Sequence, residues 1–199
     1  MMIPDPTFAL PPLRPVLRGH LVQLQTAHAT LRPFLRSDLP RWRRFDDHRQ
    51  GGRRDPAGVD EEARFLGLMH RSRLQQENDQ LLLGVFDAER GTLLDQLHVR
   101  LHSLHARSAE LRSVQHWHAH TEAALLALCP FLFNDVGLHR LFVLLPTECD
   151  TPFARALRAS GFEQEGVLRD QHLDLHGWHD RQLLALTAPA WRHSRQRAR

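Results

Sequence analysis

Residues 108–123 read SAELRSVQHWHAHTEA, and the fold is decided here. The first part, SAELRSV (108–114), largely alternates between polar and apolar residues, which predicts a strand. The segment HTEAALLALCPFLFNDVG (120–137) is long and apolar and ends at a glycine, which predicts a helix. HRLFVLLP (139–146) then predicts a buried strand. A strand, a helix and a strand in this order form a βαβ unit, so we expect part of the sheet to be parallel.

The remaining segments extend this unit on both sides. Apolar patterns with the strand or helix period predict the other elements. The predicted strands cover 16–25, 80–88, 92–104, 162–174 and 178–187, and the predicted helices cover 27–37, 60–78 and 150–162. Thr26 would cap the first of these helices, and Asp150 or Thr151 the last. We interpret the charged, glycine-rich residues 46–58 as a loop and the basic residues 192–199 as a tail without structure.

The element order predicts an α/β (α+β) fold. We expect a single domain with a mixed central sheet of about six or seven strands flanked by helices. The domain is expected to cover 16–188, after a proline-rich N-terminal arm (1–15) and before a basic tail (189–199). A chain of 199 residues is long enough for one hydrophobic core.

The basic residues have an unusual composition. All 26 are arginines, and the chain contains no tyrosine. A GC-rich genome explains this bias, because lysine and tyrosine have AT-rich codons; selection of arginine for phosphate binding is the alternative. The net charge of +3 permits weak attraction to anions but does not require a nucleic-acid partner.

The cysteines and the apolar runs bear on location. Cys129 and Cys149 are too few for a disulfide framework, which favours the reducing cytoplasm. The longest apolar run is too short to cross a bilayer, and the N-terminus lacks the pattern of a signal peptide. We therefore expect a cytoplasmic protein with no membrane partner.

Five short motifs follow one another along the chain. They are AEL (109–111), the turn from Gln115 to TEA (121–123), GLHRLFV (137–143), GFEQEGVLRD (161–170) and HGWHD (176–180). In this order and spacing they resemble the GNAT superfamily of acyl-CoA-dependent N-acyltransferases. Within it, they are most similar to the branch of the ribosomal-protein N-terminal serine/alanine acetyltransferases, and the resemblance covers residues 16–188.

This resemblance implies a binding site for acetyl-CoA at the turn between the strand and the helix. In the family, backbone N–H groups of this turn and of the helix start bind the pyrophosphate of coenzyme A. The implied cofactor-binding residues are Val114, Gln115, His116, Trp117, His118, Ala119, His120 and Thr121, with Asp150 at the start of the later helix.

Three residues are candidates for catalysis. Glu110 is the candidate base, because a carboxylate on the strand beside the cleft could deprotonate an ammonium directly or through water. An ion pair between Glu110 and an arginine is the alternative. Cys149 and Thr151 are candidate proton donors to the leaving thiolate, and a structural role is the alternative for each.

The sequence departs from the family pattern in two places. His118 and His120 stand where the family keeps glycine, or glycine and then alanine. A side chain must then fit where phosphate approaches, and a positive φ would cost on the order of 1–2 kcal/mol. Phe153 and Leu157 stand where the family commonly has serine or alanine and then tyrosine. Without a placed acid, acyl transfer would depend mainly on positioning.

The histidines also permit a metal site. Alternate residues of an extended segment share a face, so His116, His118 and His120 could act together. Further ligands could come from the preceding strand: His98, His102 and His105. Because 15 histidines are scattered along the chain, chance clusters are common, and we expect no physiological metal ion.

The sequence therefore predicts an enzyme of bacterial origin, an acyl-CoA-dependent N-acetyltransferase. It would transfer an acetyl group to a primary amine, either a protein N-terminus or a small amine. Its expected partners are acetyl-CoA and the acceptor, and we expect a monomer or a homodimer. The alternative is a catalytically impaired GNAT-fold binding or regulatory protein. Such a protein could contact nucleic acid through the arginine tail and Arg41, Arg43, Arg44, Arg53 and Arg54.

Overall fold

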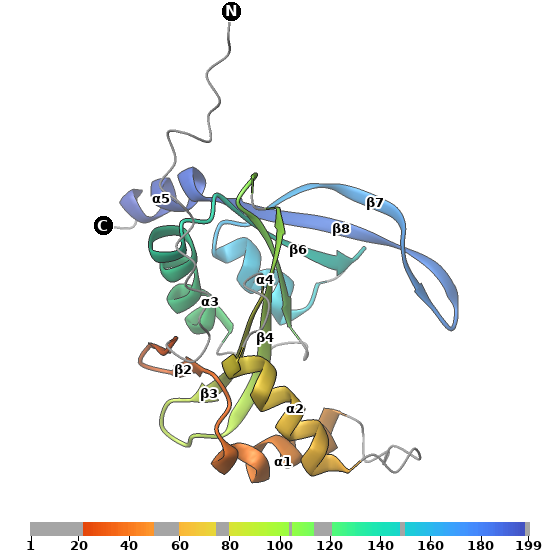
Figure 1. Ribbon diagram of the computed structural model, residues 1–199. Coiled ribbons are helices and arrows are strands. Elements are labelled where there is room, and N and C mark those ends of the chain that lie inside the picture. The colour runs from red at the N-terminus through yellow and green to blue at the C-terminus, as the bar shows by residue number, and fades with distance from the viewer. Residues whose placement is uncertain are drawn as a thin grey trace, which may run out of the picture.

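One mixed sheet runs through the molecule, with helices packed on both of its faces (Figure 1). The computed structural model describes residues 22–49, 60–74, 80–103, 105–113, 121–147 and 150–197. Within these residues the sheet has eight strands in the order β1-β2-β3-β4-β5-β6-β8-β7, against the about six or seven predicted. The strands are β1 (Leu24–Gln25), β2 (Ala29–Arg32), β3 (Gln80–Asp87), β4 (Leu93–Ser103), β5 (Ser108–Ser113), β6 (Arg140–Pro146), β7 (Glu163–Asp174) and β8 (Gly177–Thr187). The helices are α1 (Leu39–Arg49), α2 (Glu61–Leu74), α3 (Thr121–Pro130), α4 (Pro152–Ala159) and α5 (Ala188–Arg197), with the short segments η3 (Arg36–Asp38) and η4 (Phe131–Val136).

The βαβ unit predicted at residues 108–146 is confirmed. β5 and β6 are parallel, with Ser108 opposite Arg140 and Glu110 opposite Phe142. α3 and η4 lie between these strands in the chain. The other neighbouring strands pair antiparallel. The sheet is therefore mixed, as predicted.

The long apolar helix of this unit changes its winding at Pro130. Proline has no N–H to donate, and after Pro130 the chain continues as the wider π-helical turns of η4. Gly137 ends the segment with a φ of 82°, the left-handed conformation that glycine adopts without steric cost.

Among the described residues, no helix is long and apolar enough to cross a membrane.

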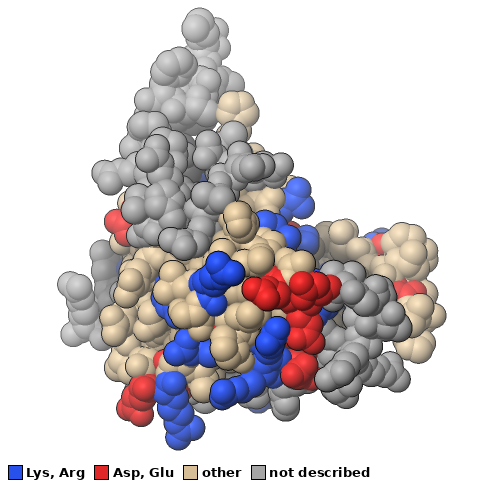
Figure 2. All heavy atoms as spheres, turned by 60° about the horizontal axis from the view of Figure 1, so that its bottom comes forward, with Lys and Arg blue, Asp and Glu red and all other residues tan. Residues whose placement is uncertain are grey.

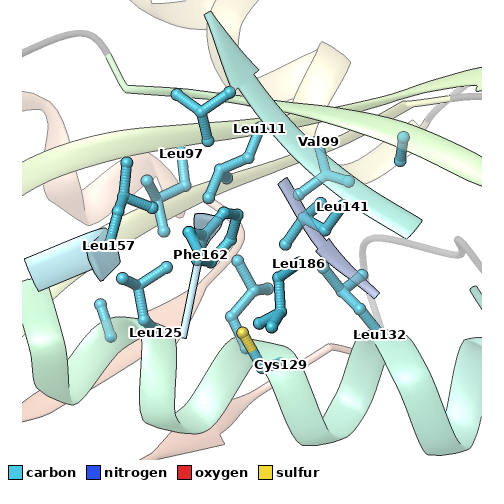
Figure 3. Close-up of a cluster of buried hydrophobic side chains, with 14 of the residues drawn as sticks. Leu97, Val99, Leu111, Leu125, Cys129, Leu132, Leu141, Leu157, Phe162 and Leu186 are labelled. Atoms are coloured by element: carbon cyan, nitrogen blue, oxygen red, sulfur yellow. The ribbon is translucent and has the colours of Figure 1, made fainter. Parts of the chain in front are cut away.

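Two hydrophobic cores lie on opposite faces of the sheet. The main core packs α3, α4 and α5 against the sheet, and Figure 3 shows its centre. The labelled side chains there are Leu97, Val99, Leu111, Leu125, Cys129, Leu132, Leu141, Leu157, Phe162 and Leu186. The second core packs α1 and α2 against β3 and β4 through Phe34, Trp42, Phe45, Phe65, Leu68, Phe86 and Leu93. No described helix covers the remainder of this second face, over β5 to β8.

The helix predicted at residues 27–37 is wrong. Ala29–Arg32 form β2, which pairs with β1 and β3. Thr26 does not cap a helix; its Oγ1 accepts a hydrogen bond of 3.0 Å from a backbone N–H of β2 and closes the β1–β2 turn. Leu31 is fully buried in the main core. Strand pairing and this burial outweigh the local helical pattern.

The predicted loop at 46–58 is wrong at its beginning. Its first four residues form the last turn of α1, and 50–59 lie outside the described residues. The predicted N-terminal arm (1–15) and most of the strand predicted at 16–25 also lie outside the described residues.

The C-terminal segment is also different from the prediction. The tail predicted to be without structure at 192–199 is helical as far as 197, because α5 covers 188–197; residues 198–199 lie outside the described residues. Trp191 is buried in the main core and packs on Phe133, with ring centroids 5.5 Å apart. Burial of Trp191, together with that of Ala188, thus packs this basic helix against the domain.

A buried carboxylate fixes the start of α1 against β2. Asp38 has no exposed surface and accepts hydrogen bonds from Arg32 (2.7 and 2.9 Å), from the N–H of Leu35 (2.8 Å) and from Arg41 (3.1 Å). The Arg32 guanidinium also stacks on Phe86, 3.8 Å from the ring centroid. Burial by itself would raise the pKa of Asp38. The hydrogen bonds and positive charges outweigh burial, and the pKa lies below its ordinary value of 3.8.

Replacing this carboxylate should destabilise the protein in a pH-dependent manner. We expect Asp38→Asn to lower the free energy of unfolding by about 2–3 kcal/mol at neutral pH, because a charge-assisted network is lost. Since the folded-state pKa lies below the unfolded-state pKa, the wild-type advantage is complete above about pH 4 and shrinks as the pH falls through the folded-state pKa. Urea denaturation at a series of pH values measures this difference. Asp47→Asn, at an exposed position of α1, is the control, and a difference that does not change with pH would contradict the account.

Candidate active site

A cleft of about 630 Å³, lined by both polar and apolar side chains, lies on the part of the sheet that α1 and α2 leave uncovered. Side chains on β5 and β6 alternate between the main core and this cleft. Ala109 and Leu111 are buried in the core, whereas their neighbours face the cleft. The cleft-facing residues of these two strands are Ser108, Glu110, Arg112, Arg140, Phe142 and Leu144, and β4, β7 and β8 contribute the remaining walls.

The two parallel strands at the cleft separate partway along their length. Their pairing ends at Glu110 and Phe142, yet β5 continues to Ser113 and β6 continues to Pro146. β5 stays paired with β4, and β6 stays paired with β8, to these same ends. Only the edge between β5 and β6 therefore opens. Beyond this point, the peptide groups of each strand that face the other strand are available to a ligand.

Glu110 is the carboxylate at this point of separation. Its Oε2 accepts a hydrogen bond of 2.8 Å from Arg112 Nη2, and the Glu110 side chain remains 12% exposed. No other described residue that lines the cleft has a carboxylate. The structure thus places the predicted base on the cleft, and it also contains the ion pair that was the alternative interpretation.

Other charged and aromatic side chains surround Glu110. Arg100 of β4 lies directly opposite Glu110 in the strand register and is exposed. Arg140 donates two hydrogen bonds to the carboxylate of Glu165, and hydrogen bonding from Arg140 holds the pKa of that carboxyl below its ordinary value. The Phe142 ring meets the His102 ring edge to face, with centroids 5.6 Å apart.

The residues predicted at the start of α4 do not line this cleft. Thr151 is the N-cap of α4, where its Oγ1 accepts a hydrogen bond of 3.3 Å from a backbone N–H of the first turn. Asp150 is exposed and accepts a hydrogen bond of 3.0 Å from Arg155. Phe153 and Leu157 are buried in the main core, 4% and 0% exposed. These two departures from the family pattern thus have a packing role.

Most of the predicted cofactor-binding turn lies outside the described residues. This holds for Val114, Gln115, His116, Trp117, His118, Ala119 and His120, and also for the candidate donor Cys149. Thr121 begins α3, and its side chain is not described. The assignment of coenzyme A contacts to this turn therefore stays a prediction.

The described histidines bear on the alternative interpretation, a metal site formed by histidines. Within the described ranges, no three or more His, Cys, Asp or Glu residues are arranged to hold a metal ion. His98 instead lies 2.9 Å from Gln80 through its Nε2 atom, and His102 packs on Phe142. The three histidines at 116, 118 and 120 lie outside these ranges.

The arginines of α1 do not form a purely basic surface. Arg41 lies 3.1 Å from Asp38, and Arg43 lies 3.3 Å from Glu61. Figure 2 shows basic and acidic side chains beside one another on this side of the molecule. The described part of this surface therefore lacks the excess of positive charge that favours binding to a nucleic-acid backbone.

Sequence reasoning identified Glu110 but missed most of its surroundings. Arg112 shares a face with Glu110 because it lies two residues further along the strand. The same period places Arg140 and Phe142 on the cleft side of β6, between residues of the main core. The two-residue period of a strand could thus have predicted that these side chains lie on the cleft. For Arg100 this prediction also needs the pairing of β4 with β5, which the sequence does not contain.

Thr151 gives a test that separates a structural from a catalytic role. We expect Thr151→Ala to lower the free energy of unfolding by about 1 kcal/mol through loss of the helix cap. Thr151→Ser should restore the stability, since serine is an equally good cap. Chemical denaturation measures both effects. An unchanged stability of Thr151→Ala, together with loss of acetyl-CoA turnover, would contradict the capping role and favour proton donation.

Several solved structures resemble this chain. A ribosomal-protein-S5-alanine acetyltransferase from Vibrio fischeri has 16% identity and a TM-score of 0.68, over 85% of this chain and 98% of that chain. RimJ from Mycobacterium smegmatis, in complex with CoA-disulfide, has 24% identity and a TM-score of 0.61, over 89% and 93%. A GCN5-related N-acetyltransferase from Brucella melitensis has 16% identity and a TM-score of 0.67, over 90% and 84%. No protein-family model matches the sequence, and no curated protein matches it significantly. The chain therefore has the fold of the GNAT N-acetyltransferases, as its sequence motifs predict.

Proposed function

We propose that this protein is an acetyl-CoA-dependent N-acetyltransferase that acts on a primary amine, either a protein N-terminus or a small amine. The observation that carries the proposal is the opening between β5 and β6, with Glu110 at its inner end and on the wall of the cleft. The GNAT fold supports it as well, since the solved structures that share the fold are acetyltransferases.

The opened edge fits a ligand that contains amides. Peptide groups of residues 111–113 that face β6 can pair with the amides of the pantetheine arm of coenzyme A. The backbone of residues 114–120 and the start of α3 at Thr121 would then bind the pyrophosphate, because N–H groups at a helix start favour anions. Asp150, exposed before α4, completes the proposed contacts. Acetyl-CoA supplies an acetyl group that is activated as a thioester.

The chain itself has to remove a proton from the acceptor. An ammonium must lose a proton before its nitrogen can attack a carbonyl carbon. Glu110 accepts this proton directly or through water, and the hydrogen bond from Arg112 holds the carboxylate toward the cleft. Phe153 and Leu157 cannot donate a proton to the thiolate, so Cys149 and Thr151 stay the candidate donors. If neither donates, water assists the departure of the thiolate and the rate depends mainly on positioning.

Acetyl-CoA binding and acetyl transfer test the proposal separately. Calorimetric titration should show saturable binding of acetyl-CoA to the wild-type protein. Glu110→Gln should bind acetyl-CoA with a dissociation constant within about two-fold of wild type, and its kcat should fall by about 100-fold because the base is lost. Transfer is measured with acetylated product from an amine-terminated peptide and from a small amine.

Arg112→Gln separates catalysis by Glu110 from its ion pair. This variant removes the same ion pair and keeps the carboxylate, so its kcat should fall much less than that of Glu110→Gln. Equal losses in the two variants would show that only the ion pair matters. An absence of saturable binding at millimolar acetyl-CoA would contradict the proposed function and favour a catalytically impaired binding protein.

A further inference from the structure

The charges that line the cleft do not balance. Arg100, Arg112 and Arg140 line it together with one carboxylate, Glu110. Arg112 is hydrogen-bonded to Glu110, and Arg140 is hydrogen-bonded to Glu165 of β7 through both terminal nitrogens of its guanidinium. Among the described residues, no carboxylate pairs with Arg100. Among the charged side chains that the structure describes at the cleft, one positive charge is therefore left over.

The position of this charge relative to Glu110 is defined by the sheet. Arg100 and Glu110 are directly opposite one another on β4 and β5, and both side chains face the cleft. Cβ atoms of opposite residues in an antiparallel pair lie about 4.5–5.5 Å apart. A small ligand whose amino group lies at Glu110 therefore has a guanidinium within reach of its nearest substituent.

The chemistry of this guanidinium selects a class of substituent. Arginine is always charged and presents parallel N–H donors that match both oxygens of a carboxylate. Arg112 and Arg140 already use donors on carboxylates of the protein, whereas Arg100 faces the cleft and has no hydrogen bond or ion pair with the described part of the chain. A second ammonium on the ligand would be repelled at the same position.

We propose that Arg100 binds a carboxylate of the acceptor, so that the preferred acceptor is a primary amine with a carboxylate close to its amino group. This inference rests on the proposed function. The amino group lies at Glu110 and the carboxylate at Arg100, across one strand pair. A free amino acid and a peptide with an acidic N-terminal residue share this chemistry, whereas a polyamine does not.

Two pairs of isosteric acceptors test the inference. The first pair is a C-terminally amidated peptide that begins with Asp and the same peptide beginning with Asn. The second pair is free alanine and alaninamide. We expect the carboxylate member of at least one pair to bind about ten-fold more tightly than its neutral partner. The pair that shows this preference distinguishes a peptide from a free amino acid as the acceptor.

Variants of the arginine locate the preference. Arg100→Gln should abolish it, with little change in affinity for the neutral acceptors, and Arg100→Lys should keep part of it because the charge remains. Arg90→Gln is the matched control, because Arg90 is an exposed arginine in the turn between β3 and β4, away from the cleft. Equal binding of both members in both pairs, or a preference that survives in Arg100→Gln, would overturn the inference.

Two readouts keep this inference distinct from the proposed function. Acceptor affinity is measured by calorimetry without acetyl-CoA, and kcat/KM is measured with it. Binding that depends on Arg100 without any acetyl transfer would overturn the proposed function and support the carboxylate site. Acetyl transfer without any preference for a carboxylate would support the proposed function and overturn the carboxylate site.

Discussion

The end of the parallel pairing between β5 and β6 is the constraint on which the candidate site depends. If the strands were paired along their whole length, their peptide groups would satisfy one another and no ligand chain could enter the sheet. Pairing instead ends at Glu110 and Phe142, while each strand stays hydrogen-bonded to its other neighbour. The opening is therefore held by the sheet on both sides. It brings a free backbone edge and a carboxylate to the same place.

The unequal covering of the two sheet faces determines what surrounds this opening. The main core lies on one face of the sheet, which is covered by α3, α4 and α5. The other face is covered only at β3 and β4, by α1 and α2. Alternate residues of β5 and β6 thus serve two purposes, one set in the core and the other on the cleft. The cleft set can be charged because it is in contact with water. On α4, Phe153 and Leu157 pack into the same main core, which is why this helix has no proton donor at the family positions.

Much of the fold could be predicted from the sequence because its signals are local. The apolar helix before Gly137 and the strands around it identify the βαβ unit without any knowledge of tertiary contacts. The prediction of a helix at 27–37 was wrong because β2 is stabilised by pairing with β3 and by burial of Leu31. The local pattern contains neither of these contacts. The requirement for glycine at position 84 also comes from tertiary contacts. A Cβ there would lie 2.6 Å from the Phe86 ring, and the local sequence does not contain this constraint. Glu110 was identified through a motif, whereas Arg100 came to the site through strand register.

The central claim is that the open edge between β5 and β6 holds acetyl-CoA, and hydrogen exchange of backbone amides tests it most directly. Exchange is followed by mass spectrometry with and without saturating coenzyme A. We expect slower exchange in peptides that cover 111–121, because ligand amides and phosphates accept from these N–H groups. We expect little change at the end of the β7–β8 hairpin, residues 173–178, which do not line the cleft. Unchanged exchange at 111–121, with protection elsewhere or none at all, would contradict the account.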